Sequence, residues 1–367
     1  MPRTIPIEDH IAAPQIVLAS NAWTTSWLTR HFRNDREPAL FTEQLCAWWA
    51  AVCYPHGSLA RTLDVADMAQ CLTSIDDAFT RDAVRDSEPN ANSTGRDFAD
   101  TKMAREVLGR IITTGSAEHC PDDLPLAQMY ADLWNRMRAR ISPGVSERWK
   151  ELLGACRGHV TAEHDNLRNG KLLDYDALVR IRCETIHTRA FAVLTEYAMN
   201  IEIPAKLTSD RRFEELSWIL GAQTAIVNDV YSYRKECVAG DWMANVITAA
   251  RNEGLSLQSA VDKVCRHADD LESQFCSLRD ELISVWGGRR PDIAAYLREL
   301  GYLILGSVAF ERGSSRYHGP GFVWDGNLEA MVTFHTDRTE FTPANGDHAA
   351  ADSSPDMHDK FPHRSES

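Results

Sequence analysis

Apolar residues in this chain recur at spacings of three and four along most of its length, which is the period of an amphipathic helix. Runs of β-branched residues with the period-two alternation of a half-buried strand are nearly absent. Breaks that contain proline or glycine separate the periodic stretches, as expected of short loops between helices. We therefore predict an all-α fold, with helices over Phe41–Val52, Asp67–Asp82, Leu124–Ile141, Tyr175–Asn200, Phe213–Ala239, Ser256–Val285 and Pro291–Ser307.

The 367 residues are predicted to form one large helical domain with two terminal segments. Residues 1–20 are assigned as an N-terminal segment and candidate lid, 21–335 as the helical domain, and 336–367 as a polar, acidic tail. Such a tail buries too little apolar surface to offset its ordering entropy, so we expect it to be disordered. Residues 86–97 are predicted to be a polar loop within the domain.

Acidic residues outnumber basic ones by 53 to 39, which gives a formal net charge of −14 at pH 7. Long-range repulsion then disfavours a nucleic acid or an anionic membrane as a partner. The sequence contains no apolar run of about 18 residues, and its first residues lack the pattern of a secretory signal. The nine cysteines include no C-x-x-C pair and are typical of buried thiols in a reducing compartment. We therefore expect a cytoplasmic protein without a membrane span.

Two adjacent carboxylates, Asp76 and Asp77, follow the apolar face of the predicted helix Asp67–Asp82. Carboxylates beside an apolar face are costly unless they are solvated, paired or bound to a metal. An Asp-Asp pair is weakly diagnostic alone, since Asp122 and Asp123 form another at a predicted helix start. A metal-binding role for the first pair therefore needs support from a second motif.

A more specific pattern lies in the predicted helix Phe213–Ala239. Asn228, Ser232 and Glu236 are four residues apart, so each step deviates by only about 40° and the three residues share one helix stripe. An amide oxygen, a hydroxyl and a carboxylate are hard oxygen donors, which suit Mg²⁺ better than zinc or copper. The positions before this stripe are apolar, so the sequence predicts a magnesium site that emerges from a core helix.

These motifs resemble those of the class I terpene synthases (terpene cyclases) of the bacterial and fungal type. The resemblance covers roughly residues 20–320 and its motifs stand in the family's order. The matching residues are Asp76-Asp77 for the aspartate-rich motif, Arg182 for the diphosphate-sensing arginine, Asn228, Ser232, Lys235 and Glu236 for the second metal motif, and Arg316-Tyr317 for the C-terminal Arg-Tyr pair.

The aspartate-rich motif departs from the family pattern. The family carries a third carboxylate three to five residues after the first, where this chain has Phe79, Thr80 and Arg81. The next acid, Asp82, is rotated by about 240° from Asp76 on a helix, so it would reach a shared metal only from a frayed helix end. The resemblance therefore supports Asp76 as a metal ligand more firmly than Asp82.

The region of the sensing arginine also departs from the pattern. Thr185 and Ile186 occupy the positions where the family breaks a central helix and exposes a carbonyl that helps to trigger ionisation. The family favours a small residue there, which leaves the identity of this effector residue open. Arg180 is an alternative sensor, although Arg182 has the matching spacing to the second metal motif. His187 is expected to be a packed histidine rather than a base.

The resemblance implies a helical bundle around a central apolar cavity, with the two metal motifs facing each other across its mouth. It also implies three Mg²⁺ ions and a closed pocket in which aromatic faces stabilise a carbocation. The implied roles are metal ligation by Asp76, Asp77, Asn228, Ser232 and Glu236, diphosphate binding by Arg182, Lys235, Arg316 and Tyr317, and pocket lining by Phe79, Trp218 and Phe310.

The implied enzyme is a carbon–oxygen lyase acting on phosphates. It would ionise a linear prenyl diphosphate and cyclise the carbocation to a terpene hydrocarbon or alcohol, with farnesyl diphosphate slightly favoured over geranylgeranyl diphosphate. A trans-prenyltransferase of the same fold is an alternative, disfavoured because Asn228 and Ser232 replace carboxylates of a second aspartate-rich motif. A metal-dependent phosphohydrolase, suggested by His164-Asp165, and an inactive helical interaction protein are further alternatives. A homodimer is compatible with the sequence.

Overall fold

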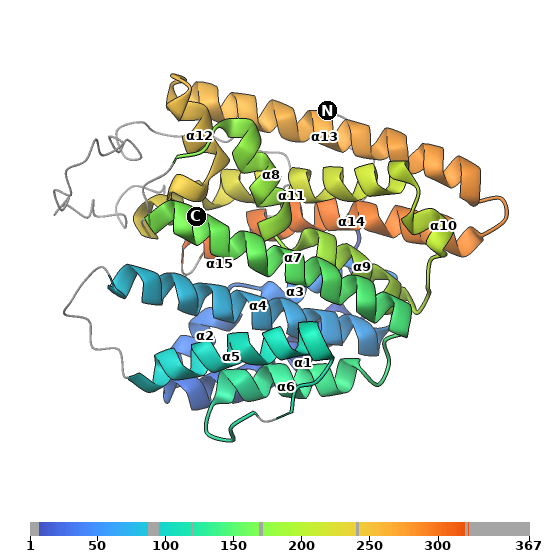
Figure 1. The fold of residues 1–367 in the computed structure, drawn as a ribbon. Coiled ribbons are helices and arrows are strands. Elements are labelled where there is room, and N and C mark those ends of the chain that lie inside the picture. Colours follow the sequence, from blue (N-terminus) through green and yellow to red (C-terminus); the bar gives the residue numbers. More distant parts are fainter. Residues whose placement is uncertain are drawn as a thin grey trace, which may run out of the picture.

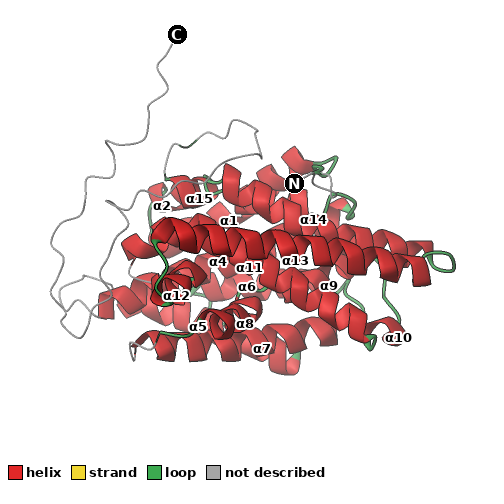
Figure 2. Ribbon diagram, turned by 90° about the horizontal axis from the view of Figure 1, so that it is seen from above, coloured by secondary structure: helices red, strands yellow, loops and turns green. Residues whose placement is uncertain are grey.

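Helices form all the regular structure in the computed structural model, which describes residues 7–86, 95–118, 120–168, 172–239, 242–319 and 322. Within these ranges, short loops connect fifteen α-helices and one 3₁₀ turn, and no strand is present (Figure 2). The predicted all-α fold is confirmed. The tail 336–367 lies outside the described residues.

The longer helices extend beyond most of the segments that the periodicity predicted. The bounds are α1 (Ala13–Phe32), α2 (Arg36–Thr42), α3 (Cys46–Cys53), α4 (Leu59–Asp86), α5 (Gly95–Thr114), α6 (Pro125–Met137), α7 (Pro143–Arg168), α8 (Tyr175–Thr185), α9 (Thr188–Met199), α10 (Ala205–Thr208), α11 (Arg211–Ala239), the 3₁₀ turn η1 (Trp242–Ala244), α12 (Val246–Asn252), α13 (Leu257–Trp286), α14 (Pro291–Gly313) and α15 (Ser315–His318).

Helix α11, which carries the second predicted metal motif, has neighbours on several sides. It packs against α13, which runs along one edge of the bundle, and contacts α8, α9 and α14 (Figure 1). Helices α1, α4, α5 and α6 lie toward the opposite edge, and α3 connects the two groups by contacting both α4 and α14. One contiguous cluster of buried apolar side chains extends from α1 to α14.

Two glycines allow helices near the centre to approach closely. A Cβ at Gly306 would lie 2.6 Å from Cys53 Sγ, so α14 can pack on α3 at this distance only without a side chain there. A Cβ at Gly221 would lie 2.8 Å from Cys183 Sγ, where α11 meets α8. These close approaches set the spacing of the helices that surround the cavity described below.

The structure interrupts two of the predicted helices. Phe41–Val52 is divided between α2 and α3 because Leu45 adopts a left-handed conformation with φ 62°. No glycine, proline or asparagine marks this break, so the periodicity alone predicted a continuous helix. Tyr175–Asn200 is divided between α8 and α9, where His187 has φ 66°. This second break lies beside the two positions predicted for it.

Helix α1 crosses residue 20, where the sequence analysis placed the start of the domain. Ile16 is fully buried, and the buried Ser20 hydroxyl donates a hydrogen bond to Asp67 Oδ1 at 2.6 Å. Arg136 Nη2 pairs with the other oxygen of Asp67 at 2.7 Å, which ties α1, α4 and α6 together. The structure therefore places residues 13–20 within the helical bundle.

Helices α1, α5 and α7 lie where no periodic segment was predicted, and α5 begins at Gly95, inside the stretch 86–97 predicted as a loop. The helical signal was present in α7, because its buried side chains Trp149, Leu153 and Cys156 follow spacings of four and three. Many charged residues between them diluted the pattern.

Helix α14 is long and apolar enough to cross a membrane by length and composition alone. However, 89% of its most apolar window of 18 residues is buried inside the protein. A core helix meets the same criteria, and the contacts of α14 with α3 and α11 account for its apolar surface.

Arg33 ends α1 in a left-handed conformation with φ 57°, and its side chain is exposed. We expect Arg33→Gly to stabilise the protein by about 0.5–1 kcal/mol, because glycine adopts this conformation without the steric penalty of a Cβ. Chemical denaturation monitored by circular dichroism measures the change. Asn200→Gly is the matched control: Asn200 also has a positive φ, of 55°, but asparagine tolerates it, so its change should be smaller. Destabilisation by Arg33→Gly would contradict the expectation.

Candidate active site

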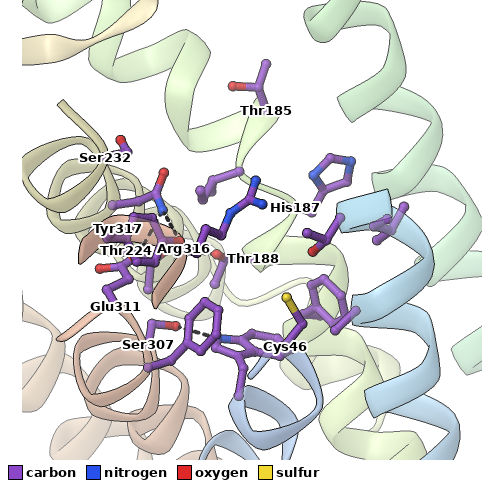
Figure 3. Close-up of a pocket in the computed structure, with 18 of the residues that line it drawn as sticks. Cys46, Thr185, His187, Thr188, Thr224, Ser232, Ser307, Glu311, Arg316 and Tyr317 are labelled. Atoms are coloured by element: carbon purple, nitrogen blue, oxygen red, sulfur yellow. Dashed lines mark hydrogen bonds between the residues drawn. The ribbon is translucent and has the colours of Figure 1, made fainter. Parts of the chain in front are cut away.

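A cavity of about 260 Å³ lies among α3, α4, α7, α8, α9, α11, α14 and α15 (Figure 3). Most of the site residues predicted from distant parts of the sequence contribute to its wall. The predicted residues that line the cavity are Arg182, Thr185, Ile186, Asn228, Ser232, Lys235, Glu236, Phe310, Arg316 and Tyr317.

Asn228, Ser232 and Glu236, here called the α11 triad, line this cavity along one stripe of α11. Ser232 is 3% exposed, and its Oγ has no hydrogen-bond partner within the described part of the chain. Burying a hydroxyl without a hydrogen-bond partner costs free energy, which is consistent with a role of this hydroxyl in binding a ligand. Three hard oxygen donors with this unpaired hydroxyl fit a divalent cation such as Mg²⁺.

Asn245 positions the third member of the triad. This fully buried residue caps α12 by accepting a hydrogen bond from Ile247 N, and its Nδ2 donates to Glu236 Oε2 at 2.7 Å. The same Nδ2 donates to the Asp229 carbonyl oxygen at 2.8 Å. These side-chain hydrogen bonds join the end of α11 to the start of α12. The sequence analysis did not single out Asn245, although an asparagine before an apolar helical run is typical of an N-cap.

Arg182 and Asp229 form a buried ion pair beside the triad. Arg182 donates to Asp229 Oδ1 through Nη2 at 2.6 Å and through Nε at 2.9 Å. Asp229 is 0% exposed, and its Oδ2 accepts from Val246 N at 2.8 Å. Burial raises the pKa of the Asp229 carboxyl, while the nearby Arg182 guanidinium opposes that rise. Arg180, the alternative sensor, is exposed and does not line the cavity.

The break between α8 and α9 brings backbone and hydroxyl groups to the cavity wall. Thr185, Ile186, His187 and Thr188 all line it, and Figure 3 labels Thr185, His187 and Thr188. Arg182 Nη1 donates to Thr185 Oγ1 at 3.3 Å, which links the arginine to the break. His187, expected to be a packed residue, is half-buried in this wall.

Helix α15 carries Arg316 and Tyr317 to the cavity. The preceding Ser314 caps the helix by accepting from Arg316 N and donates through Oγ to the Gln44 carbonyl oxygen at 2.6 Å. Arg316 Nη1 donates to Gln44 Oε1 at 2.8 Å. Tyr317 Oη accepts from Asn228 Nδ2 at 3.1 Å, and burial raises the pKa of the phenol. The α2–α3 loop thus holds α15 against the triad.

Four predicted site residues lie toward the end of α4, and their side chains are outside the described part of the structure: Asp76, Asp77, Phe79 and Asp82. Leu72 and Thr73 of the same helix line the cavity. Position 76 is four residues after Leu72 and three residues after Thr73, so it lies on the same face of α4. The side chains of His164 and Asp165, in α7, also lie outside the described part.

The aromatic wall differs from the one predicted. Phe310 lines the cavity, but Trp218 does not; it packs against the main apolar core. Trp49 and Phe191 line the cavity instead, as an edge-to-face pair with ring centroids 4.7 Å apart. Trp49 Nε1 donates to Ser307 Oγ at 3.0 Å. No sequence motif pointed to these rings, because α3 and α9 face each other only in the folded bundle.

The cavity is less uniformly apolar than predicted. Glu311 and several hydroxyl groups contribute to its wall beside the aromatic and aliphatic side chains. The hydroxyl-bearing residues outside the metal and diphosphate motifs are Thr73, Thr185, Thr188, Thr224 and Ser307. Thr224 Oγ1 and Thr188 Oγ1 are hydrogen-bonded at 2.9 Å across α11 and α9.

Comparison with known proteins decides the family. The family model described as terpene synthase family 2, C-terminal metal binding, matches residues 67–274, which is more than half of the chain. The chain belongs to terpene synthase family 2. The matched range contains both predicted metal motifs, so the predicted resemblance and enzyme class are confirmed: this terpene synthase is a carbon–oxygen lyase of a metal-binding family. The phosphohydrolase alternative is thereby set aside.

Several relatives of this terpene synthase extend over most of its length. Terpene cyclase 4 of Gibberella fujikuroi is 25% identical over 308 residues, covering 82% of this chain and 80% of the relative. Sesquiterpene synthase 1 of Postia placenta is 29% identical over 301 residues, covering 80% of this chain and 82% of the relative.

Solved structures share the fold. The structure of linalool/nerolidol synthase from Streptomyces clavuligerus with 2-fluorogeranyl diphosphate matches with a TM-score of 0.70 at 21% identity, covering 86% of this chain and 99% of that chain. An α-eudesmol synthase structure matches with a TM-score of 0.69 at 17% identity, covering 85% of this chain and 98% of that chain. At these identities the likeness shows a common terpene synthase fold.

Proposed function

We propose that this terpene synthase is a class I cyclase, which uses Mg²⁺ to ionise a linear prenyl diphosphate, guides the carbocation to a cyclic terpene hydrocarbon or alcohol, and releases diphosphate. The observation that carries the proposal is the convergence of oxygen donors and cationic groups on one cavity. These residues are Asn228, Ser232 and Glu236 as oxygen donors, with Arg182, Lys235 and Arg316 as cations.

The leaving group defines what the polar part of the cavity must do. A diphosphate carries about three negative charges, and it takes up the electron pair of the C–O bond as that bond breaks. Three Mg²⁺ ions, held by the α11 triad together with Asp76 and Asp77, would supply positive charge there when bound. The Arg182 guanidinium adds positive charge beside the diphosphate, Arg316 can donate N–H hydrogen bonds to phosphate oxygens, and the Tyr317 hydroxyl can donate a further hydrogen bond.

The remaining wall must hold the hydrocarbon chain and keep bulk water from the carbocation. Leu72, Phe191 and Phe310 provide apolar surface, and the rings of Trp49 and Phe191 can stabilise migrating positive charge through their faces. The sesquiterpene synthases among the relatives favour the 15-carbon farnesyl diphosphate over the 20-carbon substrate.

The hydroxyl-bearing part of the wall favours an alcohol among the products. A polar site with enough room can retain an ordered water molecule when the bulk solvent is excluded. The Thr188–Thr224 pair offers hydroxyl groups from two facing helices. Attack of a retained water on the cation would form a C–O bond, and its proton would pass to the released diphosphate.

Incubation with farnesyl or geranylgeranyl diphosphate and Mg²⁺ tests the proposal, with gas chromatography–mass spectrometry of the extract and assay of released diphosphate. We expect cyclic terpenes, with farnesyl diphosphate the better substrate, and loss of turnover when EDTA removes the metal. In H₂¹⁸O an alcohol product should gain ¹⁸O. Absence of any terpene from either substrate would contradict the proposal, and elongation in the presence of isopentenyl diphosphate would identify a prenyltransferase instead.

A further inference from the structure

Glu311 is a buried carboxylate in the cavity wall to which neither the predicted motifs nor the proposed mechanism assigns a role. It lies in the last turn of α14, is 4% exposed and lines the cavity, close to Tyr317 (Figure 3). Its Oε1 accepts a hydrogen bond from Asn228 Nδ2 at 3.0 Å, and Oε2 has no partner within the described ranges. Burial of a carboxylate is costly unless its contacts replace the lost hydration. The hydrogen bond to Asn228 therefore indicates which residue Glu311 acts on.

The neighbours of Asn228 determine which way its side-chain amide faces. Its Nδ2 donates to Glu311 Oε1 at 3.0 Å and to Tyr317 Oη at 3.1 Å. Its Oδ1 accepts from Arg182 Nη2 at 3.3 Å. The reversed amide would set its NH₂ group against the guanidinium, two donors together, and its oxygen against the carboxylate, two acceptors together. Glu311 and Arg182 therefore select one orientation.

We propose that Glu311 is a positioning residue for the α11 triad, which holds the Asn228 amide with its oxygen, rather than its NH₂ group, toward the metal and the diphosphate. The inference rests on the proposed function, because the orientation matters only at a metal site. Mg²⁺ binds the oxygen of an amide, so an amide that turned freely would offer a ligand in only part of its conformations.

The same contacts connect α11 to the consecutive helices α14 and α15, which are distant from it in the sequence. Glu311, Asn228 and Tyr317 lie on α14, α11 and α15, and α15 is itself held by the α2–α3 loop. Tyr317 Oη serves as the acceptor for Asn228, so its own O–H remains available to donate to a phosphate oxygen. Glu311 thus supports the metal ligand and, through it, the placement of a diphosphate donor.

Isothermal titration calorimetry with inorganic diphosphate, over a series of Mg²⁺ concentrations, tests the inference without turnover. Glu311→Gln retains an acceptor oxygen for Asn228. The Mg²⁺ concentration that this variant needs for half-maximal diphosphate binding should therefore stay close to that of the wild type. Glu311→Leu and Glu311→Met remove the acceptor, and each should need at least about ten-fold more Mg²⁺ for half-maximal binding. Met keeps the length of the side chain and serves if the Leu variant does not fold.

Glu299→Leu is the matched control, because Glu299 is also a buried glutamate of α14 but accepts from His56 and does not line the cavity. Its Mg²⁺ dependence should not change. Unchanged Mg²⁺ dependence in the folded Glu311→Leu or Glu311→Met protein would overturn the inference, and so would an equal loss in Glu311→Gln. Failure of the wild-type protein to bind diphosphate with Mg²⁺ would instead overturn the proposed function, and the positioning role with it.

Discussion

Replacement of Asn228 by alanine is expected to lower kcat by at least about 10²–10³-fold, the cost of losing one preorganised group that stabilises charge in the transition state. The amide oxygen is a proposed metal ligand, and its NH₂ group also satisfies Glu311 and Tyr317. Steady-state product formation measures the loss, and far-ultraviolet circular dichroism checks that the helices remain. Asp76→Ala, in the other metal motif, should have a similar effect.

Ser232→Ala separates ligation from structure. Because Ser232 Oγ has no partner within the described chain, its removal should leave the unfolding midpoint unchanged or slightly raised. Turnover should nevertheless fall, since a proposed metal ligand is lost. Ser277→Ala, at an exposed serine of α13, is the control and should alter neither quantity. Activity within a few-fold of wild type in both Asn228→Ala and Ser232→Ala would show that the metal site lies elsewhere.

Arg182→Leu should affect both folding and activity. It removes the partner of Asp229, whose carboxylate is 0% exposed, and breaking a buried ion pair in this way typically costs about 3–5 kcal/mol. The same change removes a proposed diphosphate donor. Denaturant unfolding and diphosphate release, measured on the same preparation, report the two effects.

The double variant Arg182→Leu/Asp229→Asn distinguishes the two effects. The amide introduced at position 229 can still accept a hydrogen bond from Val246 N and carries no charge, so most of the lost stability should return. Activity should stay low, because no guanidinium remains at position 182. Recovery of activity together with stability would show that Arg182 acts only in folding.

The helices that the sequence predicted correctly are those in which buried side chains recur every three or four residues. In α11, positions Leu216, Ile219 and Leu220 are buried, and their spacing of three and four is visible without the fold. Leu45 shows the limit of such a pattern. Its left-handed backbone turns the chain from α2 into α3, both of which contact α1, and a leucine gives no local signal for this conformation.

In the candidate site, too, local spacing predicted some residues and tertiary contacts determined others. Asn228, Ser232 and Glu236 were placed on one stripe from spacing alone, and all three line the cavity. The preference for Arg182 over the exposed Arg180 also came from spacing. Asn245 was missed, because its contact with Glu236 depends on how the chain turns after α11.

By itself the sequence determined the helical class, the oxygen stripe of α11 and the resemblance to a family. The first two depend on the spacing of residues within a few helical turns, and the third depends on the order of motifs along the chain. Only the tertiary structure decided that Glu311 faces Asn228, that Trp49 and Phe191 form the aromatic wall, and that Trp218 does not. These contacts join helices far apart in the chain, and their geometry follows from how side chains of different sizes pack between helices, which no local period encodes.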